Sequence, residues 1–386
     1  MVASRPSVHL LARHRALRQV LREHGLDALL LTHPADLAWA TDFTGEDSLG
    51  IVTPRTMVLV TDSRFEEQAQ RECPWLRVVL REGKMADALG RTLLKMGVGR
   101  IGFEAATTSF GLIMGLRASL AGHAMARTAG SRPATARRPH RFVPLENVLV
   151  GLRKVKDDVE LAVLRRAVKV AEDAFLTLRS RLKPGMTENE VAATLTWEMR
   201  RRGASDASFP VIVAAGANSS LPHYRPRQVK LPRRGVLLVD WGARLDGYCS
   251  DLTRTLFIGR PAGELKRVYG VVLEAQLAAI AAIRPGVNTC DVDKAARDHI
   301  AKAGYGPRFG HGLGHGIGRD IHEAPGLRKT PPGEPLRPGM VVTVEPGVYL
   351  PGVGGVRIED DVLVTDTGCE VLSSLGKTLE DNVLPG

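Results

Sequence analysis

The sequence predicts a mixed α/β protein with two domains. Its 386 residues are enough for two domains, or for one large one. In residues 1–151, short apolar stretches alternate with segments of helical spacing, and a ten-residue segment of the second part reappears 101 residues later. We place the boundary near Gly151, with a smaller domain over residues 1–151 and a larger one over residues 152–386.

The amino-terminal domain is expected to alternate helices with strands. Apolar residues recur at helical spacing over residues 10–23, and residues 63–72 are also helix-like. Short strands are predicted at residues 28–31, 57–60 and 77–80, where apolar residues run together. This alternation is typical of an α/β domain.

Composition argues against several classes of function. The net charge of +11 is divided as +6 over residues 1–152 (20 basic, 14 acidic) and +5 over the rest (33 basic, 28 acidic), and only 5% of the residues are aromatic. This pattern does not favour a nucleic-acid partner. No apolar run approaches the ~20 residues of a membrane helix, so no membrane partner is expected. Four scattered cysteines without a C-x-x-C pair predict no disulfide framework, and we expect a cytoplasmic protein.

The second domain contains an internal repeat. Residues Leu182–Val191 and Ile283–Val292 share a Pro-Gly pair followed by Thr or Asn, which predicts a helix end and the N-cap of the next helix. A long helix is expected over residues 157–182. Glycine-rich stretches with histidines and then strand hairpins, at residues 231–255 and 336–364, follow the two copies. We predict two α/β halves related by a pseudo-twofold axis, with a site where they meet.

Each hairpin carries two carboxylates. Asp240 and Glu345 end apolar strands, and Asp251 and Glu359 lie on the returning strands. A buried carboxylate without a partner costs several kcal/mol or more. Four converging carboxylates would also repel one another, so a divalent metal is the simplest explanation.

Three histidines lie between the hairpins. His311, His315 and His322 occur within a stretch that also contains five glycines, and this glycine density argues against a helical zinc motif. Imidazole and carboxylate without thiolate favour Mn²⁺ or another ion that prefers oxygen and nitrogen. Two ions sharing bridging carboxylates could activate water.

The order of these residues resembles that of the dinuclear metallopeptidases with the pita-bread fold, above all the proline-specific branch of aminopeptidase P and prolidase. The ordered set is Asp240, Asp251, His315, Glu345 and Glu359. The supporting motifs are Pro222-His223-Tyr224, His311-Gly-Leu-Gly-His315, Asp320-Ile-His322-Glu323, Glu345-Pro-Gly-Val-Tyr349 and Arg357-Ile-Glu359. The resemblance covers residues 152–386 and extends more weakly through residues 1–150.

The resemblance implies a ligand for every position of a two-metal site. Carried over by position, Asp240 would bind one ion, and His315 with Glu345 the other. Asp251 and Glu359 would bridge both. Mn²⁺ is the expected metal, with Co²⁺ and Zn²⁺ as alternatives. The implied fold is a pita-bread catalytic domain with pseudo-twofold α/β halves, preceded by the smaller α/β domain.

The resemblance also implies catalytic and substrate-binding residues. Glu345 would accept a proton, while His322 and His223 would lie near the carbonyl oxygen or the leaving nitrogen. The implied substrate contacts are His311, Arg357 and Tyr349. The expected substrates are peptides with proline at the second position, cut as an Xaa-Pro aminopeptidase or an Xaa-Pro dipeptidase would cut them. The expected assembly is a homodimer.

Two other functions stay open at this point. The first is a methionine aminopeptidase-like or creatine-hydrolysing enzyme; the former usually lacks so large an amino-terminal domain, and the latter lacks the full ligand set. The second is a non-catalytic pita-bread module that binds other molecules, although such modules have typically lost metal ligands. Among the neighbouring residues, Cys249 is interpreted as packing, and Asp360 and Asp361 as solvated or capping residues.

Overall fold

The computed structural model describes residues 6–128, 140–261 and 263–385. The chain divides into two compact units, Met1–Arg153 and Lys154–Gly386, which we call the amino unit and the carboxy unit. Among the described residues, no helix combines the length and the apolar character needed to cross a membrane. All four cysteines are free thiols.

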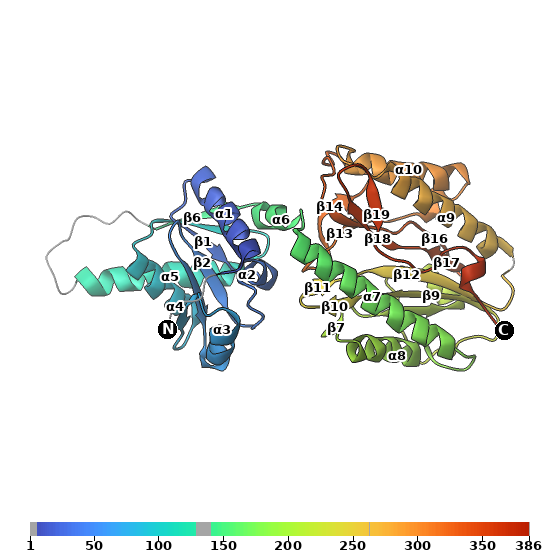
Figure 1. The fold of residues 1–386 in the computed structure, drawn as a ribbon, viewed down its shortest axis with the longest axis horizontal. Coiled ribbons are helices and arrows are strands. Elements are labelled where there is room, and N and C mark those ends of the chain that lie inside the picture. The colour runs from blue at the N-terminus through green and yellow to red at the C-terminus, as the bar shows by residue number, and fades with distance from the viewer. Residues whose placement is uncertain (1–5, 129–139, 262, 386) are drawn as a thin grey trace. The chain divides into compact units, whose positions relative to one another are not determined.

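The amino unit is built on a six-stranded sheet with the order β4-β3-β2-β1-β5-β6 (Figure 1). Strand β2 is antiparallel to β1 and β3, and the other neighbours are parallel. The strands are β1 (Ala28–Leu31), β2 (Leu49–Val52), β3 (Met57–Thr61), β4 (Arg77–Leu80), β5 (Arg100–Glu104) and β6 (Arg141–Leu145). The helices are α1 (Val8–Glu23), α2 (Pro34–Thr41), α3 (Glu66–Glu72), α4 (Met85–Met96), α5 (Phe110–Thr128) and α6 (Val148–Arg153).

The elements expected in the amino unit from the sequence are present. The predicted helix over residues 63–72 begins with a 3₁₀ turn, Ser63–Phe65, before α3. This turn forms because the Asp62 side chain accepts a hydrogen bond from the backbone N–H of Arg64. Strands β1 and β3 are buried along their whole length, as a sheet covered on both faces requires.

The first half of the carboxy unit packs two helices on a small sheet. Capping boxes at Asp157 and Thr187 begin helices α7 and α8. The Phe175 ring of α7 stacks on Trp241 with 4.2 Å between centroids, and this pair lies in the core beneath the sheet. The elements of this half are α7 (Asp158–Arg181), α8 (Glu188–Arg201), β7 (Asp206–Ala207), β8 (Ile212–Ala215), β9 (Gly235–Trp241), β10 (Ala243–Leu245), β11 (Tyr248–Cys249) and β12 (Leu252–Ile258).

The second half has the same order of elements. Its two helices pack together and cover a sheet of order β14-β13-β15-β18-β19. Its elements are α9 (Gly263–Ala282), α10 (Thr289–Lys302), β13 (Gly314–Gly316), β14 (Glu323–Leu327), β15 (Val341–Val344), β16 (Gly347–Leu350), β17 (Gly354–Arg357), β18 (Asp360–Val364), β19 (Cys369–Val371) and β20 (Val383–Leu384). Within the carboxy unit, the helix pairs α7–α8 and α9–α10 flank the strands on opposite sides (Figure 1).

The two halves are joined along their strands. Strands β9 and β12 form the first predicted hairpin, and β15 pairs with β18 in the second. A bridge between Thr253 and Glu359 connects the two sheets. Strand β20, at the end of the chain, returns to pair in parallel with β12 of the first half. The sequence repeat therefore corresponds to a repeated architecture whose halves meet at the hairpins.

Candidate metal centre

The four predicted carboxylates lie at equivalent places in the two hairpins. Asp240 is the penultimate residue of β9, and Glu345 directly follows β15. Asp251 and Glu359 directly precede the returning strands β12 and β18. Because the two sheets join at Thr253 and Glu359, these strand ends converge on one place.

His315 completes the cluster. Its Nε2 lies 3.6 Å from Oδ2 of Asp251 and 3.5 Å from Oε1 of Glu345. One ligand atom from each of Asp251, His315 and Glu359 lies within 4.8 Å of the others, a group able to hold a metal ion. The Nδ1 of His315 lies 3.0 Å from the carbonyl oxygen of Gly316, a contact that fixes this nitrogen as the donor. Nε2 is then left with its lone pair facing the carboxylates.

The glycines around His315 are required by close packing of the backbone. A Cβ on Gly314 would lie 2.0 Å from the carbonyl oxygen of Thr343, and one on Gly316 would lie 2.2 Å from that of Ala324. Side chains at these positions would push β13 away from its neighbours. The alternating glycines therefore allow His315 to enter the cluster from a strand that is packed tightly on both sides.

The electrostatics of the cluster are those of a cation site. Burial, followed by the negative charges of Glu359 and Asp240, raises the pKa of Asp251 well above its ordinary value. Burial and the charge of Glu345 do the same to the pKa of Glu359, and burial raises the pKa of Glu345 to about 8. Burial lowers the pKa of His315 to about 4, which favours the neutral, ligating imidazole.

Two buried oxygens of the cluster have no hydrogen-bond partner. They are Oδ1 of Asp240 and Oδ1 of Asp251. A buried carboxylate oxygen without a partner is costly, so such atoms require an explanation. Carboxylate and imidazole ligands, two of whose oxygens are left without a partner, fit one or more divalent cations.

Asp240 is held in place by a chain of buried polar groups. Its Oδ2 accepts a hydrogen bond of 2.5 Å from Nη2 of Arg357. Nη1 of Arg357 donates to the hydroxyl of Tyr349 at 2.8 Å, and that hydroxyl lies 2.9 Å from Nε2 of His311. Further bonds from Arg357 reach Oγ1 of Thr253 and the carbonyl oxygen of Pro222. The guanidinium is thus engaged on all sides by the protein.

The carboxylates open into a cavity of about 420 Å³. His223 and His322 are exposed side chains on its lining, and the rings of His322 and His315 lie 4.3 Å apart between centroids. An apolar part of the wall comes from Phe209, Pro210, Ile212 and Ile321. The cavity lining therefore includes every predicted site residue except Tyr349. The hydroxyl of Tyr349 contacts two of the lining residues, His311 and Arg357.

The interpretation of Asp360 and Asp361 as solvated or capping residues is wrong, because both lie within strand β18. Both are 1% exposed. Asp360 pairs with Arg254 at 2.7 Å, and Oδ2 of Asp361 accepts a hydrogen bond of 3.0 Å from the backbone N–H of Asp251. An acidic run is solvated when nothing pairs with it. Here Arg254 of strand β12 and Asp251, the residue before that strand, pair with it from more than a hundred residues earlier in the sequence.

Sequence reasoning also missed the hydroxyl groups that orient the cluster. Thr253 Oγ1 donates to Oε2 of Glu359 at 2.6 Å, and Thr343 Oγ1 donates to Oε1 of Glu345 at 3.3 Å. Each threonine lies two residues from a predicted ligand, the spacing that places side chains on one face of a strand. That spacing is the signal that could have found them.

Comparison with known proteins finds a family model for each of the two units. The family model "Metallopeptidase family M24" matches residues 162–366, and the model "Creatinase/Prolidase N-terminal domain" matches residues 13–131. The uncharacterised peptidase YqhT of Bacillus subtilis is 36% identical over 94% of this chain and 98% of its own length. An Xaa-Pro dipeptidase of Pyrococcus horikoshii is 37% identical over 62% of this chain and 68% of its own length.

Solved structures extend the agreement to the fold. The Xaa-Pro dipeptidase from Bacillus anthracis superimposes with a TM-score of 0.86 at 36% identity, over 97% of this chain and 100% of its own. The X-Pro aminopeptidase from Thermotoga maritima gives a TM-score of 0.83 at 34% identity, over 96% and 100%. They confirm the predicted class, an α/β amino-terminal domain followed by a pita-bread domain. The family model covers more than half of the sequence, so this chain belongs to metallopeptidase family M24.

Proposed function

We propose that this metallopeptidase is a two-metal exopeptidase that hydrolyses the bond between an N-terminal residue and a following proline. The observation that carries the proposal is the group of four carboxylates, three buried and one half-buried, and one imidazole, with two partner-free oxygens, at the wall of an open cavity. The relatives named Xaa-Pro dipeptidase and X-Pro aminopeptidase support the preference for proline.

The five ligand-type residues would hold two divalent ions, which we expect to be Mn²⁺, with Co²⁺ or Zn²⁺ as alternatives. Asp240 would bind one ion, His315 and Glu345 the other, and Asp251 and Glu359 both. When bound, such ions polarise a carbonyl group and make water a stronger nucleophile at neutral pH. The partner-free oxygens of Asp240 and Asp251 support this assignment.

The protein groups around the ions would handle protons and charge. Glu345, at the cavity wall, would take a proton from the attacking water. His322 and His223 would stabilise negative charge on the carbonyl oxygen or donate a proton to the leaving nitrogen of proline. The acidic cluster would attract a free α-amine, which favours cleavage at the N-terminus. The apolar wall of Phe209 and Ile321 would suit a proline ring.

Two hypotheses describe the role of Arg357, which is linked through Tyr349 to His311. In the first, Arg357 binds the carboxylate of a dipeptide, as the sequence suggested. In the second, Arg357 holds Asp240 in its binding position, and its four hydrogen bonds within the protein favour this role.

We further propose a cytoplasmic homodimer acting on peptides with proline at the second position.

Removal of a bridging ligand should remove metal and activity together. We expect Asp251→Ala to lose bound ions and to be inactive on Ala-Pro, because its carboxylate would contact both ions. Metal content by mass spectrometry and Mn²⁺-supported hydrolysis measure the two effects. Asp246→Asn is the matched control, since Asp246 is an exposed acid of the turn between β10 and β11. An Asp251→Ala variant with two ions and near-normal turnover would contradict the bridging role.

Removal of His322 should separate chemistry from metal binding. We expect His322→Ala to keep its metal content and to lose about 10²–10³-fold in kcat, the usual cost of one group that stabilises developing charge. Steady-state kinetics and metal analysis on the same sample make the comparison. If this variant loses its ions instead, His322 is a ligand and the assignment by position needs revision.

Substrate preference tests the proposed function itself. Ala-Pro and longer Ala-Pro peptides should be cleaved much faster than Ala-Ala, and N-acetylated Ala-Pro-Ala should be a poor substrate because its α-amine is blocked. Chromatographic detection of the released alanine, or of N-acetylalanine for the acetylated peptide, gives kcat/KM for each peptide. The ratio for Ala-Pro and Ala-Pro-Ala decides between a dipeptidase and an aminopeptidase. Efficient cleavage of the acetylated peptide would rule out an exopeptidase.

Chain length also decides the role of Arg357. If its guanidinium holds Asp240, Arg357→Lys should lower kcat/KM for Ala-Pro and Ala-Pro-Ala alike, by about 10–100-fold, as expected for a residue that orients a ligand. If it binds the substrate carboxylate, the dipeptide should suffer far more than the tripeptide. Unequal losses would therefore refute the supporting role.

A further inference from the structure

The last segment of the chain packs behind the proposed metal centre. We call residues 373–384 the C-terminal strap; they follow β19, end with β20 and lie beyond residue 366, where the match to the family model stops. We propose that this strap is a positioning element of the metal site, which holds the Arg254–Asp360 pair and through it Glu359. The inference rests on the proposed function, because it assumes that Glu359 binds metal.

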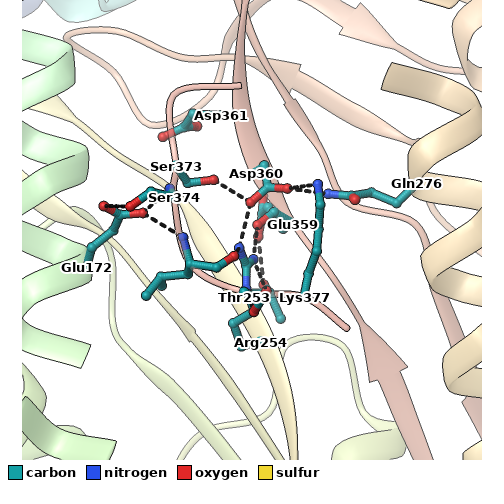
Figure 2. A network of polar contacts seen from close by, with 12 residues as sticks. Glu172, Thr253, Arg254, Gln276, Glu359, Asp360, Asp361, Ser373, Ser374 and Lys377 are labelled. Atoms are coloured by element: carbon teal, nitrogen blue, oxygen red, sulfur yellow. Dashed lines mark hydrogen bonds and ion pairs between the residues drawn. The ribbon is translucent and has the colours of Figure 1, made fainter. Parts of the chain in front are cut away.

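Asp360 is the centre of the network in Figure 2. Its Oδ1 accepts hydrogen bonds from Nη2 of Arg254, at 2.7 Å, and from the hydroxyl of Ser373. Its Oδ2 accepts from Nε2 of Gln276 at 2.7 Å and from Nζ of Lys377 at 2.6 Å. Two of these four donors, Ser373 and Lys377, belong to the strap. All the hydrogen-bonding capacity of this buried carboxylate is therefore used.

Arg254 connects Asp360 to the backbone of Glu359. Its Nη1 donates to the carbonyl oxygen of Glu359 at 2.6 Å and to that of Thr253 at 3.0 Å. Its Nη2 donates to Asp360 and to the carbonyl oxygen of Leu375 in the strap, at 2.9 Å. One rigid guanidinium thus joins β12, the proposed ligand and the strap.

The side chain of Glu359 is oriented by Thr253, the residue next to Arg254. Its Oε2 accepts from Thr253 Oγ1 at 2.6 Å, and its backbone N–H donates to the carbonyl oxygen of Thr253 at 3.1 Å. Thr253 is adjacent to Arg254 on β12. A movement of Arg254 would therefore shift both the backbone and the carboxylate of Glu359, and a ligand that is misplaced binds metal more weakly.

The strap itself is anchored from helices of both halves. Glu172 of α7 accepts hydrogen bonds from the hydroxyl of Ser374 and the backbone N–H of Leu375, both at 3.0 Å. Gln276 of α9 reaches Asp360 from the other side (Figure 2). The hydroxyl of Tyr269, also on α9, donates to the carbonyl oxygen of Lys377 at 2.9 Å. The position of the strap is therefore fixed independently of the metal centre.

The strap also changes the charge behind the cluster. Asp360 carries one negative charge, and Arg254 with Lys377 carries two positive ones, so the group has a net charge of +1 next to the carboxylates. Without Lys377 the group would be neutral. The cation that the strap supplies thus offsets part of the repulsion among the proposed ligands when they are ionised to bind metal.

Two substitutions test the strap without removing the buried pair itself. Lys377→Met deletes the cation of the strap, whose side chain is 21% exposed, and Glu172→Gln weakens the anchor on α7. We expect each to weaken Mn²⁺ binding to metal-free protein by about 10–100-fold in titration calorimetry, as for other residues that orient metal ligands. At saturating Mn²⁺, kcat should stay within about twofold of the wild type, because the loaded site recovers its geometry.

The matched control is Glu198→Gln in the same unit. Glu198 is a fully buried carboxylate held by Arg181, Arg201 and Arg202, without contact to the strap. This variant should lose thermal stability and keep its Mn²⁺ affinity. Wild-type affinity in both strap variants, or an equal loss in Glu198→Gln, would overturn the strap's role. A wild-type protein that binds no Mn²⁺ would overturn the metal centre itself, a different and recognisable failure.

Discussion

The carboxy unit depends on the gathering of four carboxylates in one place, three of them buried and the fourth, Glu345, half-buried. Isolated burial of a single such group already costs several kcal/mol, and mutual repulsion adds to this cost. The protein compensates in part: Arg357 pairs with Asp240, and threonine hydroxyls donate to Glu345 and Glu359. Oδ1 of Asp240 and Oδ1 of Asp251 have no hydrogen-bond partner, and a bound cation would provide one.

The duplicated architecture explains how chain segments so far apart bring these groups together. Each half ends one strand with a carboxylate and begins the returning strand with another, and the bridge between Thr253 and Glu359 fixes the two hairpins against each other. Strands position side chains more rigidly than loops, because their backbone hydrogen bonds leave little freedom. His315 is also positioned by a strand, the short β13. The glycines on either side of it let strands β14 and β15 pack closely against β13.

Much of this could be predicted from the sequence, because the relevant signals are local. Apolar strands that end in Asp240 and Glu345, and Pro-Gly pairs between helices, are visible in short windows. The partners of Asp360 and Asp361 are not, because Arg254 and the backbone of Asp251 come close only after the sheets have joined. The engagement of Arg357 with Asp240 was hidden for the same reason: 117 residues separate them in the chain. Long-range polar pairing therefore limits what residue patterns reveal.

Three consecutive acids, Glu359, Asp360 and Asp361, have different partners because the fold, rather than residue type, sets their surroundings. Glu359 accepts a hydrogen bond from the neutral hydroxyl of Thr253 rather than from a cation. Asp360, on the opposite face of the strand, meets Arg254 and Lys377; burial alone would raise its pKa, yet these two cations hold it below its ordinary value. Asp361 points back to the first face and commits one oxygen to the backbone of Asp251. Alternation along a strand thus leaves Glu359 as the proposed ligand, while Asp360 pairs with cations of the scaffold and Asp361 supports Asp251.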